Sequence, residues 1–369
     1  MKILVLQDYL RSGGTERQSV LLANAFAAAG HPTTLLTFRP GGTLNGTVDA
    51  TVTRATLQPF DTRCSWFAPN LVRSARQHRP EVILCMGRMA NCQAGRLQSR
   101  LPETYVIATL RTGKKLPWLY RRSLRQVRHV IANSQASARW LHHRLGLPGQ
   151  KISAIPNAIV FPAPAAGSND GRAASAERTM LRTQHQAGPA TTVLLCVAMF
   201  RPEKNHRELL QIAARLPRNG DWQLWLAGEG ETRAGCAALV QQLGLADRVK
   251  FLGYQANPTP LYHAADVAVL SSQSESLPNF LIEAQAHGLP VVAYDVGGVR
   301  ECFLPEKTGW AVPPGDVTAF AAALAPLLAD PARRAALAAG ARAFAHDGFA
   351  PASQIRRHLE LFTRLQQLA

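Results

Sequence analysis

Residues 267–294 read VAVLSSQSESLPNFLIEAQAHGLPVVAY, and this segment contains the pattern that decides the fold. It starts and ends with short apolar runs, 267–270 and 290–294, which are typical of buried strands. Between them lie a polar loop and a stretch with helical spacing. A strand, a helix and a second strand in this order predict a βαβ unit with parallel strands.

Similar strand-like runs recur on both sides of this segment and alternate with helical stretches. In the second half of the chain they lie at 192–198, 223–227, 249–251 and 310–312. The first half has its own series at 2–7, 33–38, 82–86, 105–110 and 130–133. This alternation predicts parallel sheets that helices cover on both faces. The predicted fold class is therefore α/β, with two doubly wound Rossmann-like domains in sequence.

Domain boundaries follow from length and composition, since 369 residues suffice for two ordinary domains. We predict a first domain over residues 1–160 and a second over residues 191–349. Residues 161–190 are rich in Ala, Pro, Gly and Ser, which favours a linker or loop. Residues 350–369 have an amphipathic spacing, and we expect a C-terminal helix that packs back on the first domain.

Charge is distributed unevenly along the chain. Residues 1–190 contain 25 Lys and Arg against 8 Asp and Glu, whereas residues 191–369 contain 16 against 16. Such asymmetry indicates that one domain faces an anionic partner: nucleic acid, an anionic membrane surface or a phosphorylated substrate. The alternative is an arginine-rich proteome that uses Arg as a generic solvated residue.

Several protein classes are disfavoured by missing patterns. The six cysteines form no C-x-x-C pair, which argues against a zinc ribbon or a thioredoxin-like site and favours a reduced, cytoplasmic protein. No run of about 18 apolar residues predicts a membrane span, and the first apolar run is too short for a signal peptide. Neither G-x-G-x-x-G nor G-x-x-x-x-G-K-[ST] is complete, which disfavours dinucleotide oxidoreductases and P-loop NTPases.

Two glycine-containing turns are candidate anion-binding loops. Gly13 and Gly14 join the first predicted strand to the first helix, and Gly228 and Glu229 follow a strand in the second half. Glycines allow close backbone approach, and a helix start offers N–H groups to an anion. Either turn can equally be an ordinary connection.

The loop after residue 270 contains the strongest polar cluster. Glu275 lies in this loop, Ser276 is predicted to cap the following helix with Pro278 in its first turn, and Glu283 lies further along the helix. Two carboxylates spaced in this way can accept hydrogen bonds from sugar hydroxyls. Alternatively, Glu275 is a loop charge and Glu283 is an ordinary helix-surface residue. From spacing alone, this interpretation and recognition of sugar hydroxyls are equally good.

Taken in order, the motifs of the chain resemble those of the retaining glycosyltransferases of family 4. The matching stretches are SGGTER (12–17), ANS (132–134), IPNA (155–158), RPEKNH (201–206), LAGEG (226–230), the Glu-x7-Glu pair of Glu275 and Glu283, HGLPVVA (287–293), GGVRE (297–301) and TG (308–309). That family has the GT-B fold, so the resemblance implies two Rossmann-like domains facing each other across a cleft.

The resemblance also implies roles for individual residues. Lys204 and Arg201 would neutralise the diphosphate leaving group, and Glu275 would bond hydroxyls of the donor sugar; these are the catalytic candidates. Glu283 would bond the ribose hydroxyls of the nucleotide. The implied nucleotide-binding residues are Gly13, Gly14, Gly228, Glu229, Leu277, Asn279 and Glu283.

The implied reaction is transfer of a sugar, with retention, from a nucleoside-diphosphate sugar to a glycan or lipid-linked acceptor in polysaccharide or lipopolysaccharide synthesis. A UDP-sugar is the commonest donor in the family. No Asp-x-Asp occurs, so neither a metal nor another cofactor is expected. Two positions depart from the family: Met199 stands where an Arg is frequent, and Arg111 stands where a His is frequent. Arg111 could bind a phosphate or an anionic sugar, or pair with a carboxylate.

Residues 114–122, KKLPWLYRR, combine cations with aromatic rings. Arg121, Arg125 and Arg128 share one helical face, which suits an anionic bilayer surface. We therefore expect a cytoplasmic protein attached peripherally to the inner face of the cell membrane. The alternative is a solvated basic helix with Trp118 and Tyr120 in the core.

Other functions remain open at this point. A sugar-nucleotide epimerase or a phosphorylase has the same fold, and a DNA-binding or DNA-modifying protein also suits a basic domain. The basic stretch lacks the interleaved aromatic residues of a stacking platform, so no nucleic acid partner is expected. A scaffold without activity is disfavoured by the intact Lys204, Glu275 and Glu283.

Overall fold

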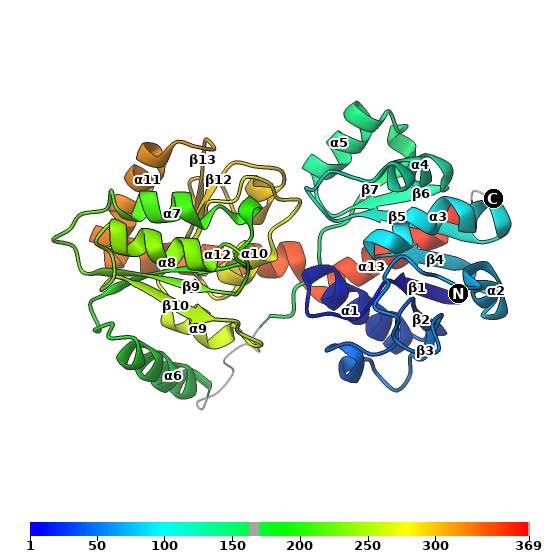
Figure 1. Cartoon of the computed structure of the whole chain (residues 1–369), viewed down its shortest axis with the longest axis horizontal. Coiled ribbons are helices and arrows are strands. Elements are labelled where there is room, and N and C mark those ends of the chain that lie inside the picture. Colours follow the sequence, from blue (N-terminus) through cyan, green and yellow to red (C-terminus); the bar gives the residue numbers. More distant parts are fainter. Residues whose placement is uncertain (162–169, 368–369) are drawn as a thin grey trace. The chain divides into compact units, whose positions relative to one another are not determined.

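Each half of the chain folds around its own parallel sheet in the computed structural model (Figure 1). The structure describes residues 1–161 and 170–367, except for the side chains of residues 170–174. Unit 1 consists of Met1–Ala158 and Pro351–Ala369, and unit 2 consists of Ile159–Ala350. The predicted α/β class, with two doubly wound domains, is confirmed.

The described part of unit 1 contains a seven-stranded sheet in the order β3-β2-β1-β4-β5-β6-β7, and its strand pairs are parallel. The strands are β1 (Ile3–Gln7), β2 (Thr33–Thr37), β3 (Thr53–Thr56), β4 (Val82–Cys85), β5 (Tyr105–Leu110), β6 (His129–Ala132) and β7 (Ile152–Ala154). The helices are α1 (Gly14–Ala28), α2 (Leu71–Gln77), α3 (Arg88–Arg100), α4 (Trp118–Gln126), α5 (Gln135–Leu145) and α13 (Pro351–Gln367), with short 3-10 turns η1 (Asn45–Thr47) and η2 (Gly149–Lys151).

Alternate side chains of the central strands enter two separate cores. In β1, Leu4 and Leu6 pack with α2, α3, α4 and α5 on one face of the sheet, while Ile3 and Val5 pack with α1 and α13 on the other. The ring of Phe362 in α13 meets that of Phe26 in α1 edge-on, with centroids 5.7 Å apart. The end of the chain thus completes the core of unit 1 (Figure 1).

The described part of unit 2 contains a six-stranded sheet in the order β10-β9-β8-β11-β12-β13. Its strands are β8 (Thr192–Val197), β9 (Trp222–Ala227), β10 (Val249–Gly253), β11 (Val267–Leu270), β12 (Val291–Tyr294) and β13 (Gly309–Val312). Its helices are α6 (Asp170–Gln184), α7 (His206–Ala213), α8 (Arg233–Gln242), α9 (Thr259–Ala264), α10 (Asn279–Ala286), α11 (Val317–Ala329) and α12 (Pro331–Phe349), with 3-10 turns η3 (Pro202–Lys204) and η4 (Val299–Cys302).

The structure differs from the sequence prediction in three elements. Strands β3 and β7 were not predicted, because β3 is largely exposed and β7 has only three residues, so neither shows a buried apolar run. The prediction of a linker or loop over 161–190 is wrong for α6; residues 162–169 lie outside the described residues. Helix α6 is held by Arg178 and Arg182, which both pair with Asp266 ahead of β11 (2.7 and 3.1 Å).

Among the residues that the structure describes, none of the helices combines the length and the apolar character that crossing a membrane requires.

Candidate active site

Two candidate residues from distant parts of unit 2 form an ion pair at the carboxyl edge of its sheet. Lys204 ends η3, after β8, and Glu275 lies in the loop after β11. Lys204 Nζ is 2.5 Å from Glu275 Oε1, and the two side chains are 25% and 10% exposed. Strands β8 and β11 are neighbours at the point where the strand order reverses, which is where open parallel sheets bind ligands.

Backbone contacts hold the two loops together. Asn205 adopts a left-handed conformation (φ 51°), which ends η3 and allows α7 to begin at once. Its carbonyl oxygen accepts a hydrogen bond from Ser271 Oγ at 3.0 Å. The Gln273 N–H donates to the Glu203 carbonyl oxygen at 2.9 Å. The loops that carry Lys204 and Glu275 are therefore tied to each other independently of the ion pair.

Glycines bring two more loops to the same edge. Gly297, after β12, has φ 56°, and a Cβ atom there would collide with the Glu275 carbonyl oxygen. Gly228, after β9, has φ 148°, and a Cβ atom there would collide with the Ala198 carbonyl oxygen. Both positions require glycine because of conformation and close backbone approach. The loops after β8, β9, β11 and β12 thus meet at this edge.

Glu283 lies in α10 and contacts α9. Its Oε2 atom accepts a hydrogen bond of 2.5 Å from the hydroxyl of Tyr262, a buried residue. The Tyr262 ring stacks on His287, with centroids 4.7 Å apart. Burial lowers the pKa of His287 to about 4, so this ring is neutral at pH 7. Tyr262 was not identified from the sequence, because no spacing links α9 to α10.

The start of α10 differs from the prediction. Ser276 was expected to cap the helix with Pro278 in the first turn, but Pro278 is the N-cap residue and α10 begins at Asn279. Leu277 precedes a proline, which disfavours helical backbone at that position. Leu277 and Asn279 therefore flank the N-cap, where the helix dipole favours an anion.

The other unit 2 candidates are exposed. Arg201 is exposed, and no hydrogen bond or ion pair of its side chain occurs within the described residues. Met199 is also exposed. Glu229 is 54% exposed and pairs with Arg233 at 3.6 Å. The structure therefore pairs the side chains of Lys204 and Glu275. Arg201 contacts Lys204 through the backbone, since its carbonyl oxygen accepts the Lys204 N–H at 3.0 Å, but among the described residues neither the Arg201 nor the Glu229 side chain forms an ion pair with Lys204 or Glu275.

A buried histidine beside Lys204 does not add charge. His206 stacks on Phe200, with centroids 4.1 Å apart and an interplanar angle of 16°. Burial, and then the charge of Lys204, lowers the pKa of His206 to about 4. The ring is therefore neutral at pH 7, and Lys204 and Arg201 supply the cationic charge of this loop. Nowhere in the described part of the chain are three or more His, Cys, Asp or Glu side chains grouped to hold a metal ion.

In unit 1, Gly13 and Gly14 lie at the start of α1. Gly13 is the N-cap residue, with extended backbone (φ −73°) that any residue can adopt. A Cβ atom there would meet only the Glu16 carboxylate, the far end of a flexible side chain, so neither backbone conformation nor space requires glycine at this position. Both glycines lie at the carboxyl edge of the unit 1 sheet, directly after the β1 loop.

Asp8 lies at the same edge and was not identified from the sequence. Its carboxylate accepts hydrogen bonds from the N–H groups of Met89 (2.9 Å) and Ala90 (2.7 Å) at the start of α3. Burial raises the pKa of Asp8 to about 6, against the lowering effect of these hydrogen bonds, and nearby Glu16 adds to the rise. Asp8 therefore titrates far closer to neutrality than an exposed carboxyl group.

The basic stretch of unit 1 forms α4 in part. Trp118 is 70% exposed, while Tyr120 is buried and its hydroxyl donates to the Thr109 carbonyl oxygen. The alternative with both rings in the core is therefore wrong for Trp118. Arg128 lies beyond the end of α4, with its guanidinium over the Tyr105 ring, so its predicted place on one helical face is also wrong. The exposed cations of α4 are Arg121, Arg122 and Arg125.

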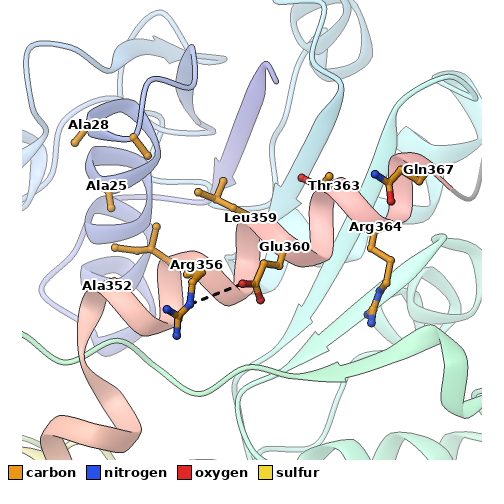
Figure 2. A pocket seen from close by; sticks show the side chains of 11 residues that line it. Ala25, Ala28, Ala352, Arg356, Leu359, Glu360, Thr363, Arg364 and Gln367 are labelled. Atoms are coloured by element: carbon orange, nitrogen blue, oxygen red, sulfur yellow. Dashed lines mark ion pairs between the residues drawn. The ribbon is translucent and has the colours of Figure 1, made fainter.

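An apolar groove of about 730 Å³ lies elsewhere in unit 1, between α1 and α13. Figure 2 shows its lining side chains, with Ala25 and Ala28 on α1 opposite Leu359 on α13. These α1 residues belong to the end of the helix remote from Gly13. The groove is therefore separate from the carboxyl-edge loops.

Two parallel-sheet units, one with an ion pair at its topological switch point, define the GT-B class. Residues 12–160 match the model of Glycosyltransferase Family 4, and residues 177–344 match that of Glycosyl transferases group 1. The chain belongs to the group 1 glycosyltransferases of the family 4 type.

Individual relatives agree with this assignment. The lipopolysaccharide core biosynthesis glycosyltransferase LpsE of Rhizobium meliloti is 34% identical over 168 residues, 46% of this chain and 47% of LpsE. The D-inositol 3-phosphate glycosyltransferase of Kineococcus radiotolerans is 32% identical over 262 residues, 64% of this chain and 57% of the relative. The chain spans about half the length of these curated relatives.

A solved structure resembles the whole chain. Anabaena HepE, crystallised in complex with UDP-glucose, superposes with a TM-score of 0.80 at 23% sequence identity. The match covers 99% of this chain and 100% of HepE. At this level of identity the likeness shows the fold.

Proposed function

We propose that this chain is a retaining glycosyltransferase that moves a sugar from a nucleoside-diphosphate sugar to a glycan or lipid-linked acceptor. The Lys204–Glu275 pair at the β8–β11 switch point carries the proposal. Cleavage of a sugar–phosphate bond leaves negative charge on a diphosphate, and a positioned cation stabilises that charge as it develops. Glu275 lies beside this cation, where a carboxylate can orient the sugar through its hydroxyls.

Each further candidate has a place in this scheme. Lys204 binds the diphosphate, with exposed Arg201 as a second cation, and the start of α10 adds N–H groups near Leu277 and Asn279. Glu283 accepts hydrogen bonds from the ribose hydroxyls, and the Tyr262 hydroxyl orients the Glu283 carboxylate. From the family resemblance, Gly13 and Gly14 also belong to the nucleotide-binding residues, as do Gly228 and Glu229.

We further propose that no metal takes part and that the donor is a UDP-sugar. Lys204, Arg201 and the α10 start supply the positive potential that a bridging metal provides in other enzymes. HepE, which has this fold, was crystallised with UDP-glucose, which supports uridine as the base. LpsE acts in lipopolysaccharide core biosynthesis, which supports a lipopolysaccharide or related polysaccharide acceptor.

Thermal unfolding with UDP, GDP, ADP or CMP, with EDTA present throughout, tests the donor site. A ligand at 100 times its Kd stabilises the folded state by about 2.7 kcal/mol, which corresponds to a shift of a few degrees. We expect UDP to give this shift, and Glu283→Gln or Lys204→Gln to reduce it. Arg218→Gln, an exposed residue of unit 2, is the matched control. If none of the nucleotides shifts the transition, the proposed donor site is wrong.

The stereochemistry has its own test. Retention predicts that the product keeps the anomeric configuration of the donor, which the proton coupling constant of the anomeric position reports. Inversion of the configuration overturns a retaining reaction while leaving the donor site intact.

Peripheral attachment to the inner face of the cell membrane is proposed for unit 1. Exposed Trp118 beside Arg121, Arg122 and Arg125 suits the headgroup region of an anionic bilayer, where each cation adds about 1 kcal/mol. We expect binding to vesicles that contain phosphatidylglycerol at low salt, weaker binding in high salt, and weaker binding of Trp118→Ala. Absence of vesicle binding at low salt contradicts the attachment and leaves the donor site untouched.

A further inference from the structure

Arg111, a half-buried arginine of unit 1, has no counter-ion among the described residues. Arg111 directly follows β5, a central strand, at the carboxyl edge of the sheet. Its Nη1 atom donates to Asn157 Oδ1 at 2.5 Å. Its Nε and Nη2 atoms are buried and have no hydrogen-bond partner among the described residues. Two of the three guanidinium nitrogens are therefore unpaired.

The surroundings of Arg111 do not compensate its charge. Burial lowers the pKa of Arg111 to about 10, and the opposing influence comes from Tyr120. Burial raises the pKa of the Tyr120 phenol far above its usual range, so this group is uncharged at pH 7. The described residues place no Asp or Glu within ion-pair distance of Arg111. A buried charge without a partner is unfavourable, because desolvation is not offset by any attraction.

A third unpaired nitrogen belongs to His358 in α13. Its Nδ1 atom is 2.8 Å from the Gln354 carbonyl oxygen, and its Nε2 atom is buried without a partner. Burial, and then the charge of Arg111, lowers the pKa of His358 to about 3. The ring is therefore neutral at pH 7. His358 is 1% exposed and its ring lies beside Phe26 and Phe362 in the core, so it supplies no charge that could compensate Arg111.

The chain pairs its other buried arginines. Arg39 makes two hydrogen bonds to the Asp61 carboxylate, at 2.7 and 2.9 Å. Arg182 pairs with Asp266 and also donates to the carbonyl oxygens of Ala264 and Gly188. Arg111 is thus the exception, and its place at the ligand-binding edge of a parallel sheet explains why its partner is absent from the chain.

We propose that Arg111 anchors an anion-binding subsite of unit 1, which takes a phosphate or carboxylate group of the acceptor. The guanidinium fork matches two oxygens of such a group. Arg111 as a whole is only half-buried, so a small rotation of its side chain brings Nε and Nη2 to a ligand at the sheet edge. This inference rests on the proposed glycosyl transfer only for the identity of the ligand, which is named as the acceptor.

The test follows the Arg111 Nε–H signal in nitrogen-15 NMR spectra while inorganic phosphate or glucuronate is added at constant ionic strength. The signal is assigned by its loss in Arg111→Lys. The protein is first saturated with UDP, so that added anions do not occupy the donor diphosphate site. We expect a saturable shift of this signal in the wild type. Calorimetric titration with the same anions, which does not need the signal, should give an affinity at least about tenfold lower in Arg111→Gln. A higher affinity for phosphate than for glucuronate indicates a phosphorylated acceptor. A higher affinity for glucuronate indicates an acceptor that contains a uronic acid.

Controls separate this subsite from general basicity and from the donor site. Arg144→Gln removes an exposed arginine of α5 and should bind both anions as the wild type does. If UDP does not bind the wild type, the titration is repeated with Lys204→Gln in the absence of UDP, so that anions no longer bind at the proposed diphosphate site. The Arg111 signal then reports on the subsite alone, and failure of the proposed donor site is recognised separately. The subsite is overturned if the Arg111 signal does not move, or if Arg144→Gln weakens binding as much as Arg111→Gln. Should Arg111→Gln fail to fold, the wild-type signal still decides.

Discussion

The two units differ in the cation that each places at the carboxyl edge of its sheet. Unit 2, with 16 Lys and Arg against 17 Asp and Glu, pairs Arg182 with Asp266 in the fold and Lys204 with Glu275 at its site. Unit 1, with 25 against 7, leaves Arg111 unpaired at the equivalent edge of its sheet. Both units wind a parallel sheet, so the fold does not set this difference. The counter-ion of Lys204 is supplied by the chain, whereas Arg111 has none among the described residues.

The largest expected effect is loss of the paired arginine of unit 2. Arg182→Met removes a buried guanidinium that donates to Asp266 Oδ2 and to the carbonyl oxygens of Ala264 and Gly188. Among the described residues, only the Val193 N–H then still donates to Asp266 Oδ2, so the substitution should destabilise the protein by about 3 kcal/mol in urea unfolding. Arg178→Met, which removes the more exposed partner of Asp266, is the control and should cost about 1 kcal/mol. Equal losses would mean that burial does not distinguish the two pairs.

Lys204 should matter for turnover and little for stability. Lys204→Met removes the cation proposed to meet the leaving diphosphate, so kcat should fall about 100-fold, equivalent to about 2.7 kcal/mol. Arg207→Met, an exposed neighbour in α7, should keep full activity. The measurement is single-turnover transfer from a labelled UDP-sugar, with unfolding curves recorded in parallel. Full activity in Lys204→Met would show that the Lys204–Glu275 pair is only structural.

Much of the fold, and part of the site, could be predicted from the sequence. Apolar runs such as 267–270 mark strands that are buried on both faces, so the strands of both sheet centres were identified. Edge strands β3 and β7 lack that pattern. Helix α6 was missed because its Ala-rich segment resembles a linker, whereas contacts of Arg178 and Arg182 with Asp266 hold it in place.

For the site, too, the sequence predicts single motifs but not the contacts between them. Lys204 and Glu275 each belong to a recognisable motif, but their contact depends on β8 and β11 being neighbours, which only the assembled sheet determines. Tyr262 and Asp8 belong to none of the motifs identified, and tertiary contacts alone bring them to Glu283 and to α3. The missing counter-ion of Arg111 is a property of its surroundings in space, so no sequence pattern can report it.

Asp8 gives unit 1 a pH dependence that can be isolated by one substitution. Its folded-state pKa of about 6 exceeds the ordinary Asp value of 3.8, so its contribution to stability is complete below pH 4 and is lost as the pH rises through 6. Asp8→Asn removes this loss. The stability of the variant relative to the wild type should therefore increase from pH 4 to pH 7, by on the order of 2 kcal/mol.

The difference between the two proteins is the informative quantity, because buried histidines shift stability in the opposite direction. Burial lowers the pKa values of His129 and His206 from 6.5 to about 4. Wild type and variant therefore both lose the stability that these neutral rings contribute as the pH falls from 6.5 through 4. These contributions cancel when Asp8→Asn is compared with the wild type. A difference that stays constant from pH 4 to pH 7 would show that Asp8 titrates like an exposed carboxyl group.

The smallest expected effect is the one that separates the two kinds of buried arginine. Arg111→Met removes one hydrogen bond to Asn157 but also removes a desolvated charge without a counter-ion, and these contributions oppose each other. The free energy of unfolding without ligand should therefore change by less than about 0.5 kcal/mol. Arg39→Met, which breaks the paired contact with Asp61, should cost about 1 kcal/mol under the same conditions. If Arg111→Met costs as much as Arg182→Met, the guanidinium supports the fold through Asn157, and the contrast between the units lies in total charge alone.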